Sequence, residues 1–170
     1  MKSVIFLSLF LVAAQYACTA QPSAAKVGEL NWLTDLSKAR ELSDATKKPI
    51  FGFFTGSDWC GWCHKLEANV FDKEAFITWA NKNVILLELD FPRRKQLPAE
   101  LAQQNQGLQQ AFQVRGYPTI WIFYITEDPT TKNLNLNALG SLGYPAGSEI
   151  GKEELKFLSD ADLILANGKK

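Results

Sequence analysis

The chain is poor in the side chains that usually hold metals and redox cofactors. Its 170 residues include one histidine, one methionine and three cysteines. A structural zinc site needs four ligands, and besides carboxylates the only candidates are His64 and the cysteines. The sole methionine is Met1, so a haem bound through His64 would lack an ordinary second axial ligand. These shortages disfavour a zinc site and a six-coordinate haem.

An excess of charge of one sign is also missing, and long hydrophobic runs are confined to the start of the chain. Eighteen basic residues balance eighteen acidic ones, so the charge suggests neither nucleic acid nor an anionic membrane as a partner. The apolar run over residues 4–14, followed by small residues up to Ala20, is too short to span a membrane. Residues 1–20 are therefore predicted to be a signal peptide cleaved after Ala20, which places the protein in the periplasm or outside the cell. The alternative is lipidation of Cys18, and only in that case is the protein expected to be attached to a membrane.

The remainder of the chain has the length of one domain. Removal of the leader leaves about 150 residues of ordinary apolar content, without an internal repeat or a low-complexity tract. We expect residues 21–29 to form a short linker and residues 30–167 to form a single domain.

Hydrophobic periodicity predicts an alternation of helices and strands. Helices are expected over residues 31–47, 60–71, 76–80, 99–112 and 148–166, and strands over residues 50–55, 84–90, 119–126 and 134–142. The first strand is a short apolar run without alternation, which is typical of a strand covered on both faces, and the second is also expected to be buried. On the final helix, we expect Leu155, Leu158, Ala161 and Leu165 to face the core.

Cys60 and Cys63 are the two cysteines beyond the leader, and they form a Cys-x-x-Cys motif after the first strand. At this spacing a first cysteine at a helix N-terminus has the second one turn further on, facing the same way. Unpaired N–H groups and the helix dipole favour the thiolate of the first cysteine. A thiolate beside a second thiol carries out disulfide exchange, so the spacing favours a redox dithiol without a bound cofactor.

Other interpretations of the same residues stay open. Cys60-x-x-Cys63-His64 is also the signature of c-type haem attachment, and such a pair can be half of a zinc site or a structural disulfide. A secreted protein that uses cysteine for stability would more often join distant segments, so this close pair favours chemistry.

Two motifs together resemble the thioredoxin superfamily. Residues 55–63 read Thr-Gly-Ser-Asp-Trp-Cys-Gly-Trp-Cys, and residues 114–119 read Val-Arg-Gly-Tyr-Pro-Thr ahead of the third strand. With the predicted leader and the extra N-terminal helix, they resemble exported bacterial thiol-disulfide oxidoreductases, such as the reducing C-terminal domain of the periplasmic disulfide interchange protein. The resemblance implies an α/β thioredoxin fold with a central mixed sheet of about four strands in the order βαβαββα.

The resemblance also implies roles for individual residues. Cys60 would be the nucleophile and Cys63 the resolving thiol, while Pro118 would be a cis-proline beside the disulfide. The implied substrate-binding residues are Trp59, Gly61, Trp62, Tyr117 and Pro118. The implied partners are protein or peptide disulfides and an upstream redox protein, with no nucleic acid. The resulting prediction is a protein-disulfide reductase or isomerase; the alternatives are a haem-binding electron carrier and a non-catalytic thioredoxin-like binding module.

The sequence departs from the family where a general base is expected. Thioredoxin itself has a buried aspartate in the strand before the cysteines, whereas residues 51–54 contain no acid and the second strand offers Glu88. Glu88 is therefore the candidate base, and a carboxylate that simply reaches solvent is the alternative. His64 follows the second cysteine and is a candidate modulator of the thiolates. The basic residues 93–95 are expected at the active-site end of the sheet, with a solvated loop at a distance as the alternative.

Overall fold

The computed structural model describes residues 28–168. The predicted leader, the processing of Cys18 and nearly all of the predicted linker lie outside the described residues and stay predictions. Within residues 28–168, no helix is long and apolar enough to cross a membrane.

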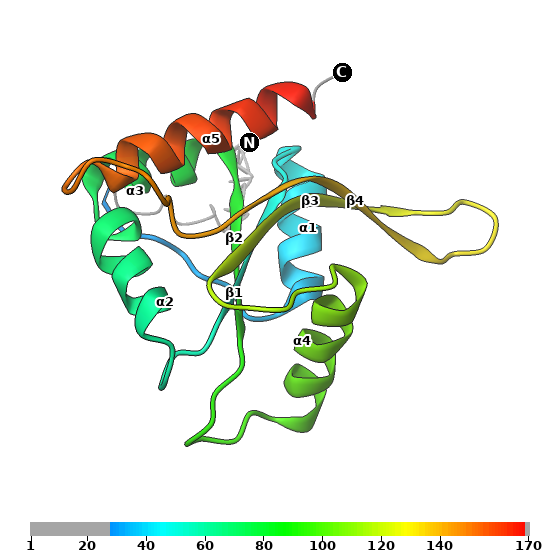
Figure 1. The fold of residues 1–170 in the computed structure, drawn as a ribbon. Coiled ribbons are helices and arrows are strands. Elements are labelled where there is room, and N and C mark those ends of the chain that lie inside the picture. The colour runs from blue at the N-terminus through cyan, green and yellow to red at the C-terminus, as the bar shows by residue number, and fades with distance from the viewer. Residues whose placement is uncertain (1–27, 169–170) are drawn as a thin grey trace, which may run out of the picture.

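The order of elements is the one that the resemblance implies, βαβαββα after an additional helix (Figure 1). The elements are α1 (Leu36–Thr46), β1 (Ile50–Thr55), α2 (Gly61–Leu66), the π-helical turn η1 (Glu67–Phe71), α3 (Glu74–Asn83), β2 (Ile85–Asp90), α4 (Ala99–Ala111), β3 (Thr119–Glu127), β4 (Leu134–Leu142) and α5 (Glu153–Asn167).

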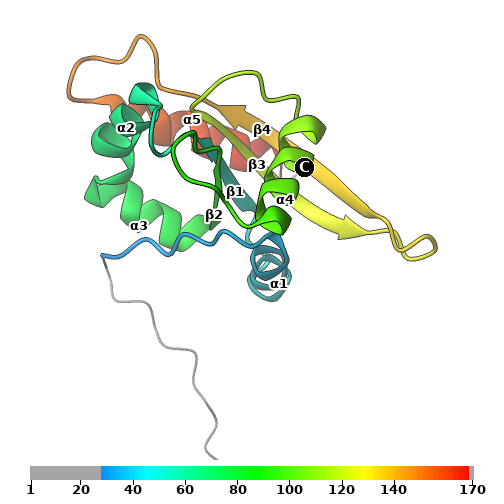
Figure 2. The same cartoon turned by 90° about the horizontal axis from the view of Figure 1, so that it is seen from below.

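The four strands form one mixed sheet in the order β2-β1-β3-β4. β1 and β2 are parallel, with Phe53 opposite Glu88, whereas β3 is antiparallel to both of its neighbours. Because β1 and β2 run parallel, their carboxyl ends share one edge of the sheet, and β1 leads from that edge into α2. The β3–β4 hairpin extends beyond the body of the domain (Figure 2).

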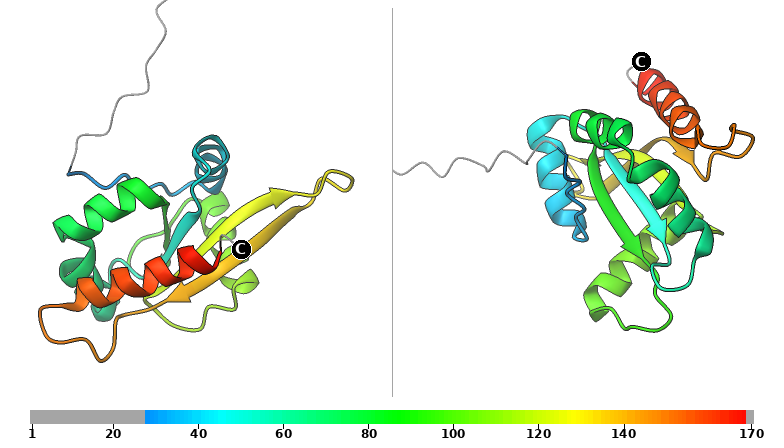
Figure 3. Two further views of the ribbon diagram at one scale, coloured as in Figure 1. Left: turned by 90° about the horizontal axis from the view of Figure 1, so that it is seen from above. Right: turned by 90° about the vertical axis from the view of Figure 1, so that its left-hand side faces the viewer.

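Helices cover both faces of the sheet (Figure 3). Side chains of β1 alternate between the faces: Phe51 and Phe53 belong to the core shared with α2, α3 and α5, whereas Ile50 and Phe54 belong to the core shared with α1 and α4. All six residues of β1 are buried. Burial on both faces explains why apolar and polar residues do not alternate along this strand.

The first helix begins later than predicted, at Leu36 and not at residue 31. The Asp35 carboxylate caps α1 by accepting hydrogen bonds from the N–H groups of Ser37 and Lys38. Before the cap the chain is extended, and Leu33 bonds to the free edge of β2 through Leu86 O and Glu88 N. Pairing with an exposed strand edge therefore prevails over the helical pattern of these residues.

The last helix also begins later than predicted, at Glu153 and not at residue 148. Gly151 has a φ of +82°, which breaks a right-handed helix and favours glycine. The prediction that Leu155 faces the core is wrong, because Leu155 is exposed, whereas Phe157 is buried in its place. Phe157 and Ala161 share one face at a spacing of four residues, and this face packs on β4 and α3.

Candidate active site

Cys60 lies at the junction between β1 and α2, at the edge where the parallel strands end. It is the N-cap residue of α2, and Cys60 N donates to Gly56 O at 2.8 Å, which forms the tight turn out of β1. This turn places the first cysteine at the start of the helix and the second cysteine inside its first turn, as the spacing predicts.

Cys60 and Cys63 are joined in a disulfide, with Cα atoms 5.3 Å apart. The Cys63 N–H donates to Cys60 Sγ at 3.2 Å. Cys60 keeps 5% of its surface exposed, whereas Cys63 has none. An incoming sulfur therefore reaches Cys60 first, and a hydrogen bond to its sulfur favours the charged thiolate once the disulfide is reduced.

The Tyr117–Pro118 peptide bond is cis, which is the geometry that the resemblance implies. The Tyr117 ring meets the Trp59 ring edge to face, with centroids 5.7 Å apart. Its hydroxyl accepts a hydrogen bond from Gln109 Nε2 at 2.6 Å, and burial raises the pKa of Tyr117. The structure thus brings the segment before β3 against Trp59, the residue before Cys60, while the substrate-binding roles of Tyr117 and Pro118 stay predictions.

The loop after β2 is hydrogen-bonded to Asp58 and Trp59, the two residues before Cys60. The Asp58 carboxylate accepts hydrogen bonds from Arg93 N at 2.9 Å and Arg94 N at 2.7 Å, and these bonds hold the pKa of Asp58 below its ordinary value. The Arg93 guanidinium lies 3.6 Å from the Trp59 ring centroid, and Trp59 Nε1 donates to Phe91 O at 2.8 Å. The loop with the basic residues 93–95 therefore lies against Asp58 and Trp59, just before Cys60, and the alternative of a distant loop is wrong.

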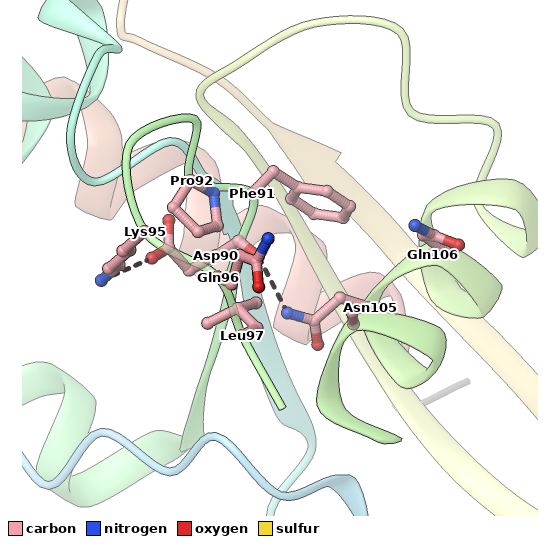
Figure 4. Close-up of a pocket in the computed structure, with 9 residues that line it drawn as sticks. Asp90, Phe91, Pro92, Lys95, Gln96, Leu97, Asn105 and Gln106 are labelled. Carbon is pink, nitrogen blue, oxygen red and sulfur yellow. Dashed lines mark hydrogen bonds and ion pairs between the residues drawn. The ribbon is translucent and has the colours of Figure 1, made fainter. Parts of the chain in front are cut away.

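A second carboxylate, Asp90, fixes the same turn from the end of β2. It accepts hydrogen bonds from Ser57 N at 2.8 Å and Ser57 Oγ at 2.7 Å, and it pairs with Lys95 Nζ at 3.0 Å. Burial alone would raise the pKa of Asp90, but the bonds from Ser57 and Lys95 outweigh it and lower the pKa. Asn105 Nδ2 donates to the backbone oxygen of Asp90 at 3.0 Å, and both residues line a cavity of about 330 Å³ between this loop and α4 (Figure 4).

Glu88 shares a cavity of about 360 Å³ with Glu67 and Thr55 on the α2 side of the sheet. Burial, followed by the charge of Asp90, raises the pKa of Glu88, and burial also raises the pKa of Glu67. Thr55 Oγ1 is buried without a hydrogen-bond partner. Glu67 was not predicted, although it follows Cys63 by four residues on one helix, a spacing that places the two side chains on the same face.

His64 and Trp62 differ in what holds them. His64 Nε2–H donates to Ser57 O at 2.9 Å, since a carbonyl oxygen can only accept. Trp62 is 56% exposed, and its ring packs against Tyr144, with centroids 5.1 Å apart. Lys65 Nζ lies 4.5 Å from the Trp62 ring centroid. Tyr144 is a further residue that the sequence did not reveal, because nothing local links it to the motif.

Gly61 is exposed at the first position of α2, and the place of a Cβ on it has no neighbour within 4 Å. The surface beside the disulfide is therefore open at this residue. Among residues 28–168, no three histidine, cysteine or acidic side chains are placed together to hold a metal ion.

A cysteine pair at the start of a helix and a cis-proline just before the third strand of a four-stranded mixed sheet define the thioredoxin-like class of proteins. The sequence matches the Thioredoxin-like family over residues 31–124, more than half of the chain. The chain belongs to this family.

Two curated relatives come from Chlamydia pneumoniae. The chain is 33% identical over 115 residues to the disulfide bond reductase DsbH, an alignment that covers 68% of each protein. It is 24% identical over 134 residues to the thioredoxin-related protein DsbJ, covering 79% of this chain and 36% of DsbJ.

Solved structures agree with the fold. A structure of a DsbH oxidoreductase superposes with a TM-score of 0.66 and 28% identity, covering 87% of this chain and 93% of that one. A thioredoxin from Thermus thermophilus superposes with a TM-score of 0.54, covering 82% of this chain and 89% of that one. At 15% identity, the second likeness shows the fold alone.

Proposed function

We propose that this protein reduces disulfide bonds in exported polypeptides, by thiol-disulfide exchange at Cys60 and Cys63 in the periplasm. The observation that carries the proposal is the Cys60–Cys63 disulfide at the start of α2, in which Cys60 keeps 5% of its surface exposed and Cys63 keeps none. The likeness to a disulfide bond reductase over 68% of both chains supports the direction of the reaction. The predicted signal peptide supports the compartment.

The reaction begins with reduced Cys60 and Cys63. The Cys60 thiolate attacks one sulfur of the substrate disulfide, which forms a bond between Cys60 and the substrate and releases the other substrate sulfur as a thiolate. Cys63 then loses its proton and attacks Cys60, which closes the Cys60–Cys63 disulfide and releases the first substrate sulfur. Two electrons have passed to the substrate, whose two thiolates then take up the two protons that Cys60 and Cys63 gave up, and an upstream dithiol protein must reduce the pair again.

The proton of Cys63 needs an acceptor, because the thiol is fully buried. Glu88 and Glu67 are the candidates, since both line the cavity beside α2 and burial raises the pKa of each carboxyl, which makes it a stronger base. The Thr55 hydroxyl has no hydrogen-bond partner and lines the same cavity, so it can bind a water that bridges it to one of these carboxyl groups.

Trapping of mixed disulfides tests the proposed chemistry. Cys63→Ser should leave Cys60 able to attack but unable to be released, so complexes with exported proteins should accumulate on non-reducing gels. Cys60→Ser is the matched control, since it keeps one buried thiol and should trap nothing. Equal trapping by the two variants would overturn the assignment of the nucleophile, and the absence of trapping in both would support a structural disulfide or a non-catalytic binding module.

The haem alternative is tested by colour. The protein should be colourless when it is produced together with a haem-attachment system, because His64 would have no second histidine as a partner and, once the predicted leader is removed, no methionine. A Soret band that survives denaturation would show covalent haem at Cys60 and Cys63 and would replace the proposal.

A further inference from the structure

A cavity of about 190 Å³ is lined by three lysines from two separate parts of the sequence. The lysines are Lys47, Lys48 and Lys82, and Tyr124 and Leu139 lie on the wall beside them. Within residues 28–168, no carboxylate lines this cavity. Three cations around one hollow, without an acidic side chain, indicate a place where an anion binds.

Hydrogen bonds hold the lysine-bearing segments in place. Lys47 caps the end of α1, where its N–H donates to Ser43 O at 2.8 Å and its backbone oxygen accepts from the Tyr124 hydroxyl at 3.2 Å. Lys48 Nζ donates to Asn81 O at 2.7 Å and so reaches from the end of α1 to the end of α3. An ammonium group has three donors, so Lys48 keeps two of them for a ligand.

The positive charge at the cavity exceeds the negative charge of the helix ends around it. α1, α3 and α5 all end here, because Lys47, Asn83 and Gly168 belong to the lining. The carboxyl end of a helix has a partial charge of about −0.5, so three such ends balance only about half of the charge of three lysines. Lys47 and Lys82 form no ion pair with any of residues 28–168. The surplus positive charge is therefore available to a ligand.

The lining favours an amphiphilic anion over an inorganic one. Lysine binds phosphate as a point charge, and Leu139 and Leu165 form an apolar wall beside the lysines. An inorganic phosphate would leave that wall in contact with water. The cavity is smaller than the roughly 300–1,000 Å³ of pockets that enclose a drug-sized ligand, so it suits one headgroup and not a whole lipid. A phospholipid in a bilayer offers both parts, a phosphate and an adjoining apolar region.

The cavity lies at the end of the domain opposite the disulfide. Pro49 lines the cavity and directly precedes β1, whereas Cys60 follows the other end of this strand. The six residues of β1 span about 20 Å. Figure 1 shows the end of α5 and the start of α2 on opposite sides of the molecule. A membrane bound at the cavity therefore leaves Cys60 open to other proteins.

We propose that Lys47, Lys48 and Lys82 form a binding site for the phosphate group of an anionic phospholipid, which docks the protein on a membrane surface with Cys60 directed away from it. The inference goes beyond the proposed function and does not require it. The balanced net charge of the chain does not reveal this site, since only the fold brings the three lysines together. In the sequence, residues 169 and 170 are also lysines and directly follow Gly168 of the lining.

Vesicle binding tests the site. The mature chain, without residues 1–20, is mixed with vesicles of phosphatidylcholine alone or of phosphatidylcholine with phosphatidylglycerol, and flotation separates bound from free protein. Removal of the leader also removes Cys18, so lipidation cannot contribute. We expect binding to the anionic vesicles alone, and release as the ionic strength rises from about 0.05 M to about 0.5 M, because salt screens attraction between exposed charges.

Neutral variants locate the site. A lysine near an anionic leaflet contributes about fivefold to binding, so Lys82→Gln should lower the partition coefficient about fivefold, and Lys47→Gln combined with Lys82→Gln should lower it about 25-fold. Lys47→Arg combined with Lys82→Arg keeps both charges and should retain the wild-type value. Lys48 is left intact because it bonds to Asn81.

Lys38→Gln combined with Lys73→Gln is the matched control. Lys38 and Lys73 stand nine residues before Lys47 and Lys82, at the other ends of α1 and α3, about 14 Å away along each helix. The control removes the same net charge from the protein, and it should lower the partition coefficient by about twofold at most. All four lysines are exposed, so the two double variants should unfold in urea as the wild type does.

Three outcomes would overturn the site. Equal binding to both kinds of vesicle, or binding to neither, would show that the lysines do not select an anionic lipid. Equal losses in the glutamine double variant and the matched control would show attraction by the charge of the whole protein. Displacement from the vesicles by millimolar inorganic phosphate, at constant ionic strength, would show that the cavity takes a free anion. Each of these outcomes leaves disulfide reduction by Cys60 untouched, so the site and the proposed function fail separately.

Discussion

Substitution of Gly56 by alanine should destabilise the protein through Trp59. The place of the new methyl group lies 2.5 Å from Nε1 and 2.8 Å from Cζ2 of the Trp59 ring, whereas carbon contacts are ordinarily about 3.5–4.0 Å. The ring is held by the bond from Nε1 to Phe91 O and by the Arg93 guanidinium over its face. The methyl group and the ring cannot both keep their places.

Two responses are available, and they have similar energies. If the ring stays, overpacking costs about 1–3 kcal/mol. If the ring moves, it gives up a hydrogen bond of about 0.5–1.5 kcal/mol and a cation–π contact of about 0.5–1 kcal/mol. We therefore expect Gly56→Ala to lower the free energy of unfolding by about 2 kcal/mol, which corresponds to a decrease of about 5–8 °C in Tm for a domain of this size.

Gly107→Ala is the matched control for this substitution. Gly107 lies inside α4, and the place of a Cβ on it has no neighbour within 4 Å. Alanine there should stabilise the helix by about 0.8–1 kcal/mol. Urea unfolding of both oxidised variants, followed by tryptophan fluorescence, measures the difference of about 3 kcal/mol. If Gly56→Ala unfolds within about 0.5 kcal/mol of the wild type, Trp59 is not held as the structure shows.

Three further predictions concern charged groups around the site. Asp90→Asn should destabilise the protein by about 2 kcal/mol at pH 7, because it weakens the charge-assisted hydrogen bonds from Ser57. The folded pKa of Asp90 is lowered, so this stabilisation is present above the unfolded pKa and is lost as the pH falls through the folded pKa. Urea unfolding near pH 3 should therefore show a smaller difference from the wild type. Glu88→Gln should become more stable relative to the wild type as the pH rises from 4 to 7, because the raised folded pKa of Glu88 favours its protonated form and that stabilisation is lost above it; equal pH profiles of unfolding would contradict this. Asp58→Ala should lower Tm more than Arg93→Ala, because the first removes the acceptor of two backbone N–H groups and the second removes only a contact with the Trp59 ring; thermal unfolding in the reverse order would contradict this role of Asp58.

Local patterns in the sequence were sufficient to predict most of the fold. The apolar runs over β1 and β2 predicted buried strands because both faces of these strands are covered. The Cys-x-x-Cys spacing predicted the helix start at Cys60, since that relation depends only on neighbouring residues. Where local pattern and tertiary pairing competed, pattern failed: residues 31–35 have helical spacing, yet Leu33 bonds to the edge of β2.

The parts of the site that join distant segments depend on the tertiary structure. The sequence by itself determined which two cysteines are paired and that a proline precedes β3, because both are properties of short motifs. It did not show that Asp58 accepts the backbone N–H groups of the loop after β2, or that Tyr144 packs on Trp62. Nearly every residue has a backbone N–H group, so the sequence does not show which N–H groups a carboxylate accepts. The residues around an aromatic side chain likewise do not show which distant ring it packs against. Only the parallel pairing of β1 with β2, and the return of β4 toward α2, decide which of these groups meet.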